Sequence, residues 1–395
     1  MTAGTASSQP LDGRTILFLV TEDWYFLSHR LPLARAARDA GARVVVATRI
    51  NDARARLEAE GFTVVPIPFD RSGLDPLRDL ATIRAIHACY RRHAPDIVHH
   101  VAMKPTLYGT LAGYLAGVPH IVNAMAGMGF LFISQGIKAR LLRPAIRAAM
   151  RLANRGRRVR VIVQNDDDRD LFRAHLGVPD RRIATIRGSG VDVDALRPAP
   201  EPAVDDGHPP VALCLSRMLW DKGIGELVEA ARLLRRRGVP LTIRLVGPGD
   251  ANPAAIDPEQ LQAWTREGLV ESLGRTADIA GAYAASHIAV LPSYREGLPK
   301  SLLEAAACGR PIVATDVPGC REICVEGETG LRVPARAVEP LADALQRLAA
   351  DPALRARMGA AARRMAETRF ATDRIVAETL ALYTTMLAGR GDIRA

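Results

Sequence analysis

The sequence predicts an α/β protein with two doubly wound domains, each built on a parallel sheet that helices cover on both faces. Short β-branched runs alternate with longer amphipathic stretches in the first half, and the alternation restarts after a proline-rich segment at residues 197–210. The 395 residues suffice for two or three domains, and 48% apolar with 24% charged residues excludes a disordered or collagenous chain.

The first half of the chain begins with a buried-strand pattern at residues 15–20 (TILFLV), followed by a helical pattern at 31–40 that Gly41 ends. A second helical stretch covers 106–116. Further strands are predicted at 43–47, 97–100, 121–124 and 159–164. We therefore expect a disordered tail at 1–13 and an N-terminal domain at 14–196.

The segment 197–210 contains five prolines, which predicts a stiff linker without a core of its own. The second half is predicted to form strands at 211–216, 242–246, 289–293 and 311–315, with helices at 223–237, 299–307 and 340–349. We expect a C-terminal domain at 211–375 and a final helix, 376–395, that returns to the N-terminal domain. In such sheets, ligands bind at the carboxyl ends of the strands.

Basic residues outnumber acidic ones by 53 to 43, and arginine supplies 49 of the 53. The excess lies in residues 1–200, with 29 basic and 18 acidic side chains, whereas residues 201–395 have 24 and 25. A biased codon usage alone does not predict this asymmetry. The basic half indicates an anionic partner such as nucleic acid, a membrane surface or a phosphorylated ligand.

Five cysteines without framework spacing favour a reducing compartment over a disulfide scaffold. We expect neither a signal peptide nor a transmembrane helix, because no long apolar run is present. Cys320 and Cys324 have no second Cys/His pair, so a zinc site is not expected. The glycine-rich segments at 188–190 and 247–249 do not complete a dinucleotide motif, which disfavours a nicotinamide dehydrogenase.

The most informative segment is 291–319 (LPSYREGLPKSLLEAAACGRPIVATDVPG), a predicted strand, loop, helix and strand. A helix N-terminus after a strand offers backbone N–H groups to an anion. Glu296 and Glu304 flank that position and can accept hydrogen bonds from the vicinal hydroxyls of a ribose or hexose. Arg217 and Lys222 bracket a loop after another strand, and together they suit a diphosphate.

Arg217 and Lys222 followed by Glu296-x7-Glu304 resemble the donor-site pattern of retaining glycosyltransferase family 4. SRMLWDKG, GSGVD, LVGPGD, LPSYREGLPKSLLEA and ATDVPGCREI carry the resemblance within residues 14–385, and SHRLPLA, MKPTLYG and NAMAGMGFLF resemble its bacterial polysaccharide and lipid-linked oligosaccharide branch. The resemblance implies the GT-B fold, in which two Rossmann-like domains face each other across a cleft.

The resemblance also implies a nucleotide-sugar donor, most often a UDP-sugar, with retention of configuration and without a metal or other cofactor. Arg217 and Lys222 would hold the diphosphate and stabilise the leaving group, Glu304 would bind the ribose, and Glu296 would contact the transferred sugar. Arg217, Lys222 and Glu296 are thus the expected catalytic residues. The other expected donor-binding residues are Gly247, Gly274, Arg275, Gly297 and Leu298.

The expected acceptor is a lipid-linked, polyprenyl-diphosphate saccharide. Many family members place a histidine near the reacting sugar, but the matching position in this sequence holds Ala126, which argues against a histidine-assisted step at that turn. Polar residues at strand ends of the N-terminal half are candidates to line the acceptor site: His29, His99, His100, Lys104 and Asn123.

A basic stripe lies within residues 137–158. Arg140, Arg143, Arg147, Arg151 and Arg158 fall within about 80° of arc on a helical projection, with Ile137, Leu141, Ala145, Ala149 and Leu152 on the other side. The stripe is either a solvated polar face or a platform for anionic lipid headgroups. The second interpretation places the protein in the cytoplasm, peripherally on the inner face of the membrane.

Two other functions remain open from the sequence. A sugar-nucleotide epimerase or phosphorylase would use the same donor site without a lipid acceptor. A nucleic-acid-binding protein would use the basic half, but the three Trp, seven Tyr and eight Phe do not interleave with the arginine stripe. We therefore expect no nucleic-acid partner.

Overall fold

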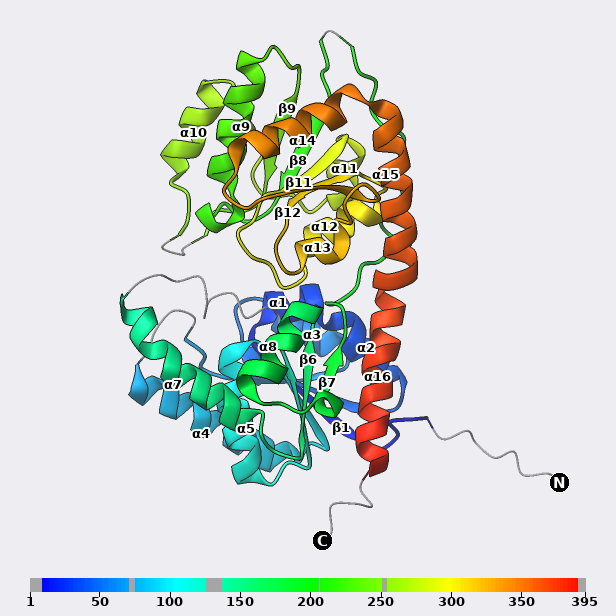
Figure 1. Cartoon of the computed structure of the whole chain (residues 1–395). Helices are drawn as coiled ribbons and strands as arrows, with labels where there is room; N and C mark the ends of the chain where they lie inside the picture. The colour runs from blue at the N-terminus through cyan, green and yellow to red at the C-terminus, as the bar shows by residue number, and fades with distance from the viewer. Residues whose placement is uncertain (1–8, 71–74, 126–136, 206, 251–253, 390–395) are drawn as a thin grey trace, which may run out of the picture. The chain divides into compact units, whose positions relative to one another are not determined.

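The computed structural model describes residues 9–70, 75–125, 137–205, 207–250 and 254–389 (Figure 1). The chain forms two compact units: Met1–Ser189 with Ile375–Ala395, and Gly190–Arg374. Each contains a parallel sheet with helices on both faces, which confirms the predicted α/β class. None of the helices in the described ranges is long and apolar enough to cross a membrane.

The N-terminal unit is built on a seven-stranded sheet with the order β3-β2-β1-β4-β5-β6-β7, and every neighbouring pair is parallel. The strands are β1 (Thr15–Glu22), β2 (Arg43–Arg49), β3 (Thr63–Pro66), β4 (Ile97–Val101), β5 (His120–Ala124), β6 (Val159–Val163) and β7 (Ile183–Thr185). The predicted strands of the first half are therefore all present.

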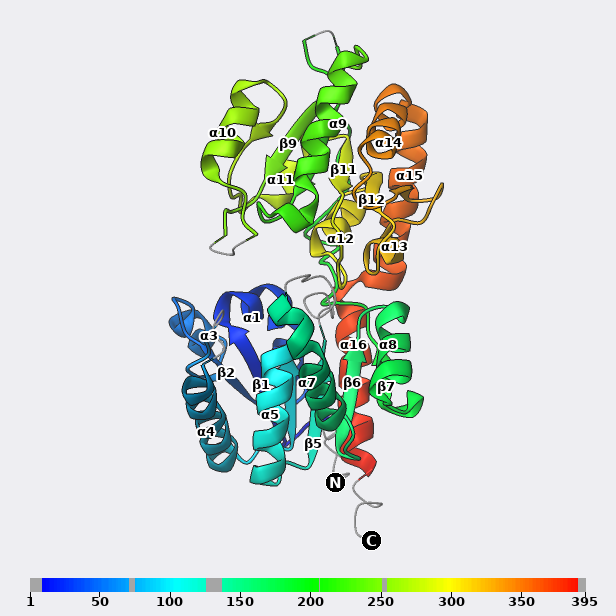
Figure 2. The ribbon, with the colours of Figure 1, turned by 60° about the vertical axis from the view of Figure 1, so that its left-hand side comes forward.

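Alternate residues of β1 pack against different helices, because successive side chains of a strand point to opposite faces. Ile16 and Phe18 share a core with residues of α1 (Asp23–His29), α2 (Leu31–Asp39), α3 (Arg54–Ala59) and α16 (Thr372–Ala388). Leu17 and Leu19 share the opposite core with residues of α4 (Pro76–His93), α5 (Met103–Ala116), α7 (Ile137–Ala153) and α8 (Asp166–Leu176). Figure 2 shows α4, α5 and α7 beside one another.

Both termini of the N-terminal unit contribute to its core. Leu11, within the expected disordered tail, is fully buried, and its N–H donates to the Ala40 carbonyl at 3.0 Å. Residues 9–13 thus pack on the unit, and residues 1–8 of the expected tail lie outside the described residues. Helix α16 places Ile375 and Tyr383 in the same core as β1, so the end of the chain belongs to this unit.

The C-terminal unit has a six-stranded parallel sheet with the order β10-β9-β8-β11-β12-β13. Its strands are β8 (Val211–Leu215), β9 (Thr242–Val246), β10 (Glu271–Ser272), β11 (Ile288–Leu291), β12 (Ile312–Thr315) and β13 (Gly330–Val333). One core contains residues of α9 (Ile224–Arg236), α10 (Pro258–Arg266) and α14 (Val338–Ala350). The other contains residues of α11 (Ile279–Ala284), α12 (Lys300–Ala307) and α13 (Cys320–Ile323). Helix α15 (Pro352–Met365) contributes to both.

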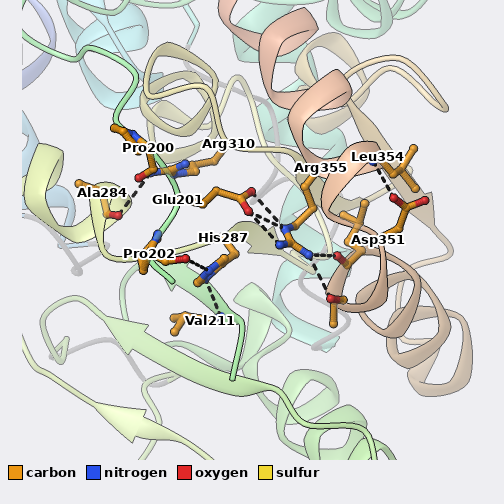
Figure 3. A network of polar contacts seen from close by, with 12 residues as sticks. Pro200, Glu201, Pro202, Val211, Ala284, His287, Arg310, Asp351, Leu354 and Arg355 are labelled. Carbon is orange, nitrogen blue, oxygen red and sulfur yellow. Dashed lines mark hydrogen bonds and ion pairs between the residues drawn. The ribbon is translucent and has the colours of Figure 1, made fainter. Parts of the chain in front are cut away.

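The proline-rich segment 197–210 lies within the C-terminal unit, not between two domains as we expected. Polar side chains of that unit hold it in place (Figure 3). Glu201 pairs with Arg355 at 2.8 Å, the Arg310 guanidinium donates to the Pro200 carbonyl at 3.3 Å, and His287 lies 3.1 Å from the Pro202 carbonyl. The sequence signal was misleading because proline excludes regular structure but leaves carbonyls and side chains free to bind neighbours.

Candidate functional site

The candidate donor site of the C-terminal unit begins where β8 ends. Ser216 and Arg217 follow the strand, the short 3-10 helix η2 (Trp220–Lys222) comes next, and Gly223 leads into α9. Gly247 lies against this turn: a Cβ on it would be 1.8 Å from the Ser216 carbonyl oxygen. The carboxyl ends of β8 and β9 therefore meet at a point where only glycine fits.

Lys222 and Glu296 form an ion pair, with Nζ and Oε1 2.5 Å apart. Gly223 makes this geometry possible. It adopts a φ of +70°, and a Cβ on it would lie 2.0 Å from the Pro292 carbonyl oxygen. The turn after η2 thus packs directly against the end of β11, which carries the loop that contains Glu296. The lysine side chain is only 19% exposed and the glutamate side chain 12% exposed, so water screens the pair weakly.

Arg217 also has a carboxylate partner, Asp250, with Nη1 and Oδ2 2.6 Å apart. The Asp250 side chain is 6% exposed, whereas that of Arg217 is 41% exposed. The sequence interpretation missed Asp250, although the LVGPGD motif contains it. Its signal is its position just after β9, since residues at the carboxyl ends of neighbouring parallel strands lie close together.

The loop that carries Glu296 is held from several sides. Gly319 has a φ of +81°, and a Cβ on it would be 2.3 Å from the Gly297 carbonyl oxygen. Tyr294 donates from its hydroxyl to Glu226 at 2.7 Å, and the Arg336 guanidinium lies 3.8 Å from the centre of its ring. Burial and the contact with Glu226 raise the pKa of Tyr294 to about 12, so the hydroxyl keeps its proton and continues to donate. Gly297 and Leu298 are half-buried.

Glu304 lies on α12 and is 9% exposed. Burial raises its pKa to about 7, and the Lys300 ammonium, 3.8 Å away, opposes that shift.

Gly274 and Arg275 lie in the exposed loop after β10, where the Gly274 carbonyl accepts from the Gly247 N–H at 2.8 Å. A backbone hydrogen bond therefore joins the loop after β9 to the loop after β10.

The candidate acceptor residues of the N-terminal unit divide into core residues and more accessible ones. His100 and Asn123 are fully buried and bonded to each other at 2.8 Å, and the other His100 ring nitrogen lies 2.8 Å from the Tyr90 hydroxyl. Burial lowers the pKa of His100 to about 4. These two residues build the core in place of the acceptor role that we expected, because both ring nitrogens of the histidine are used inside the unit.

His29 is half-buried and stacks on the Tyr25 ring, with centroids 4.1 Å apart. His99 is buried, with Nδ1 2.5 Å from the Tyr383 hydroxyl. Lys104 donates to the Asp70 carbonyl at 2.8 Å. His29 and His99 line one pocket, which does not include Lys104. Ala126, the position where many family members have a histidine, lies outside the described residues.

Helix α7 carries most of the basic stripe. Arg147 and Arg151 are exposed and Arg143 is half-buried, and the side chain of Arg140 lies outside the described part of the chain. Arg158, just after the helix, donates to the Val118 carbonyl at 3.5 Å. The apolar side chains that α7 turns to the core are Ile146, Met150 and Ala153. Ala145, Ala149 and Leu152, which lie on the other side of the helical projection, are exposed as well, and Leu152 is 71% exposed.

Known proteins resemble the chain in both halves. A family model described as "Glycosyl transferase 4-like" matches residues 15–165, and one described as "Glycosyl transferases group 1" matches residues 209–351. The chain is 29% identical over 347 residues to the N,N'-diacetylbacillosaminyl-diphospho-undecaprenol alpha-1,3-N-acetylgalactosaminyltransferase of Campylobacter jejuni, covering 84% of this chain and 90% of that protein. It is 30% identical over 291 residues to a D-inositol 3-phosphate glycosyltransferase of Pseudarthrobacter chlorophenolicus, with 69% and 67% covered.

Solved structures share the fold at lower identity. Sucrose-phosphate synthase from Thermosynechococcus elongatus superposes with a TM-score of 0.78 at 20% identity, covering 95% of this chain and 99% of that chain. Anabaena HepE in complex with UDP and glucose gives 0.73 at 22% identity, with 94% and 100% covered.

Two doubly wound units of this topology define a glycosyltransferase of the GT-B fold. The paired cations and carboxylates lie at strand ends of the C-terminal unit. The chain belongs to the group 1, family 4-like glycosyltransferases, and the predicted family and fold are confirmed.

Proposed function

We propose that this glycosyltransferase transfers a sugar from a UDP-sugar to a lipid-linked saccharide carried on a polyprenyl diphosphate, in the biosynthesis of a surface polysaccharide or glycan. The observation that carries the donor side is the pair of buried carboxylate contacts in the C-terminal unit, Lys222 with Glu296 and Arg217 with Asp250, just after β8, β9 and β11. The acceptor side is supported by the name of the Campylobacter relative, which describes a diphospho-undecaprenol substrate, and by its similarity over most of both chains.

The donor diphosphate binds to the two cations that pair with carboxylates in the structure. Arg217 and Lys222 each face a carboxylate, so their guanidinium and ammonium groups are pre-positioned before the donor binds. When the diphosphate binds, Lys222 turns part of its hydrogen bonding from Glu296 to phosphate oxygens. Glu296 then accepts hydrogen bonds from the sugar hydroxyls, and Glu304 accepts those of the ribose.

The reaction proceeds with retention on the front face of the sugar. The bond between C1 and the diphosphate oxygen breaks, the bond between the acceptor oxygen and C1 forms, and the acceptor proton passes to a donor phosphate oxygen. Negative charge grows on the leaving diphosphate, and Arg217 and Lys222 stabilise it there. Because these cations supply the compensating charge, we propose that the reaction needs no metal ion.

The enzyme acts from the cytoplasm on the inner face of the membrane, where the lipid-linked acceptor is anchored. Two features of the N-terminal unit support this. Exposed arginines lie on α7. Exposed apolar side chains lie on the same helix and on the neighbouring α5: Leu152 is 71% exposed, Leu111 49% and Leu115 65%. Basic residues near an anionic surface each contribute about 1 kcal/mol to binding.

A donor panel with a transfer assay tests the proposal. Thermal shifts are measured with UDP-, GDP-, ADP- and dTDP-sugars, and each donor that shifts the unfolding temperature is then incubated with undecaprenyl-diphosphate-linked saccharides. We expect a shift with UDP-sugars alone and transfer that gives an α-linked product. A shift only with another nucleotide contradicts the donor class, and release of free sugar or an epimerised donor without transfer contradicts the lipid acceptor.

A further inference from the structure

A pocket lies at the carboxyl end of the N-terminal sheet, and none of the candidate donor residues lines it. Its empty space is about 350 Å³, open solvent at the mouth included. Apolar residues of β6, of the segment after β7 and of α16 form much of its wall. The polar side chains that line it are His29, Arg30, His99, Ser189 and Thr379.

Arg30 brings a permanent positive charge into this pocket. The residue is 6% exposed, and its Nη1 donates to the His29 carbonyl at 3.0 Å. Its Nε is buried without a hydrogen-bond partner, and among the described residues Arg30 makes no ion pair with a carboxylate. A buried charge is costly unless a group of opposite charge faces it. Arg30 therefore differs from Arg217 and from Lys222, each of which faces a carboxylate.

His99 supplies a second polar atom to the pocket. It is 2% exposed, its Nδ1 lies 2.5 Å from the Tyr383 hydroxyl, and its Nε2 is buried without a partner in the described chain. Burial, together with the positive charge of Arg30, holds the pKa of His99 well below its usual value, so the ring is neutral near pH 7. When the Tyr383 hydroxyl donates to Nδ1, the single ring proton lies on Nε2 and makes it a donor.

We propose that this pocket binds a phosphoryl group through Arg30 and His99, and, on the basis of the function proposed above, that the group belongs to the diphosphate of the lipid-linked acceptor. A guanidinium and an N–H group, with no carboxylate between them, select an anion over a neutral hydroxyl or a cation. The Ser189 hydroxyl lies on the same wall and can donate a third hydrogen bond. The apolar remainder of the wall strengthens these contacts by excluding water.

Binding of inorganic pyrophosphate to the full chain tests the anion site. Because pyrophosphate also fits the donor site, the titration uses a background of R217M and K222M, which removes the donor cations of the other unit. We expect one pyrophosphate per chain on that background, and at least tenfold weaker binding once R30Q is added. R35Q is the matched control, since Arg35 lies on the adjacent helix and its guanidinium pairs with Glu60 instead of facing the pocket. Equal binding with and without R30Q overturns the site.

A measurement on the unsubstituted chain guards against loss of folding in R30Q. The ¹⁵N signals of the His99 ring report which nitrogen carries the proton. Pyrophosphate is expected to fix the proton on Nε2 and to shift that resonance, with UDP present to fill the donor site. An unchanged His99 spectrum at saturating pyrophosphate contradicts the proposal.

The source of the phosphoryl group is decided by farnesyl diphosphate, a short polyprenyl diphosphate that dissolves in water. On the R217M and K222M background it should bind at least tenfold more tightly than pyrophosphate, with the same dependence on Arg30. Binding no tighter than that of pyrophosphate assigns the pocket to free phosphate and overturns its link to the acceptor. Because neither titration requires sugar transfer, failure of the proposed function leaves this result unaffected.

Discussion

The ammonium of Lys222 lies 2.5 Å from the carboxylate of Glu296, although 74 residues separate them in the chain. Each residue neutralises the charge of the other, so we expect substitution of the lysine and substitution of the glutamate to have different effects on donor binding. In K222M the carboxylate of Glu296 stays behind without its partner and repels the donor diphosphate. In E296Q the ammonium is free to bind that diphosphate.

The first prediction concerns this pair. K222M should lower both UDP affinity and turnover, the latter by at least about 10²-fold, the order expected when one charge-stabilising group is lost. E296Q should retain UDP affinity or increase it, yet lower turnover by a similar factor because the contact with the sugar changes. Calorimetric UDP titrations and single-turnover kinetics measure the two effects. Near-normal turnover in either folded variant contradicts the site assignment.

Gly223 provides the second prediction, because its turn sets the position of Lys222. G223A would bring a Cβ to 2.0 Å from the Pro292 carbonyl oxygen at a φ of +70°. The turn must then move, and UDP affinity should fall at least tenfold. Gly238 is the matched control: it has the same φ, but nothing lies within 4 Å of its Cβ position. G238A should cost about 1 kcal/mol of stability and leave UDP binding unchanged. Equal losses of UDP affinity in both variants contradict the argument.

Glu304 predicts a pH dependence of stability. Burial raises the pKa of this carboxyl from its usual 4.5 to about 7, so the folded chain holds the proton more tightly than the unfolded chain does. This group's contribution to stability is therefore fully present below pH 4.5 and is lost as the pH rises to about 7. E304Q should gain on the order of 3 kcal/mol over the wild type between pH 4.5 and pH 8.

Urea unfolding followed by tryptophan fluorescence at both pH values measures this difference. E259Q, which alters an exposed glutamate on α10, serves as the control and should show no pH-dependent gain. If the difference in unfolding free energy between E304Q and the wild type stays constant across this pH range, the pKa of Glu304 is not raised by burial.

The fourth prediction concerns the segment that the sequence assigned to a linker. Arg355 has a side chain that is 2% exposed and pairs with Glu201 (Figure 3). E201Q removes the compensating charge and should destabilise the C-terminal unit by about 3 kcal/mol. E229Q breaks the more exposed pair with Arg232 and should cost less than about 1 kcal/mol. If E201Q costs no more than E229Q in urea unfolding, the segment does not stabilise the unit.

Membrane association gives the fifth prediction. Reversal of Arg143, Arg147, Arg151 and Arg158 to glutamate should abolish co-sedimentation with liposomes that contain phosphatidylglycerol, because four attractive charges become repulsive. Reversal of four exposed arginines of the C-terminal unit, Arg236, Arg266, Arg347 and Arg364, makes the same change of net charge and should leave binding largely intact. Equal loss in both variants indicates a net-charge effect and contradicts a docking surface on α7.

The sequence predicted the strands well because their signal is local. A buried parallel strand is a short β-branched run, and TILFLV at β1 and RVVVA at β2 need no distant partner to be recognised. Short helices were harder. Helix α1 was not predicted, because the side chain of its first residue, Asp23, accepts hydrogen bonds from the N–H groups of Asn51 and Ala53, contacts that exist only once β1 and β2 are paired.

The family and the two-domain α/β architecture were determined by the sequence alone, and the same compact motifs pointed to Arg217, Lys222, Glu296 and Glu304 as candidate donor residues. Only the tertiary structure decided what these residues and others face: Lys222 against Glu296, Arg217 against Asp250, and His100 and Asn123 turned into the core. It also brought Arg30, His99 and the wall from α16 into one pocket. The physical reason is that charge pairing and burial depend on which strand ends meet in space, and a parallel sheet joins ends that the chain keeps far apart.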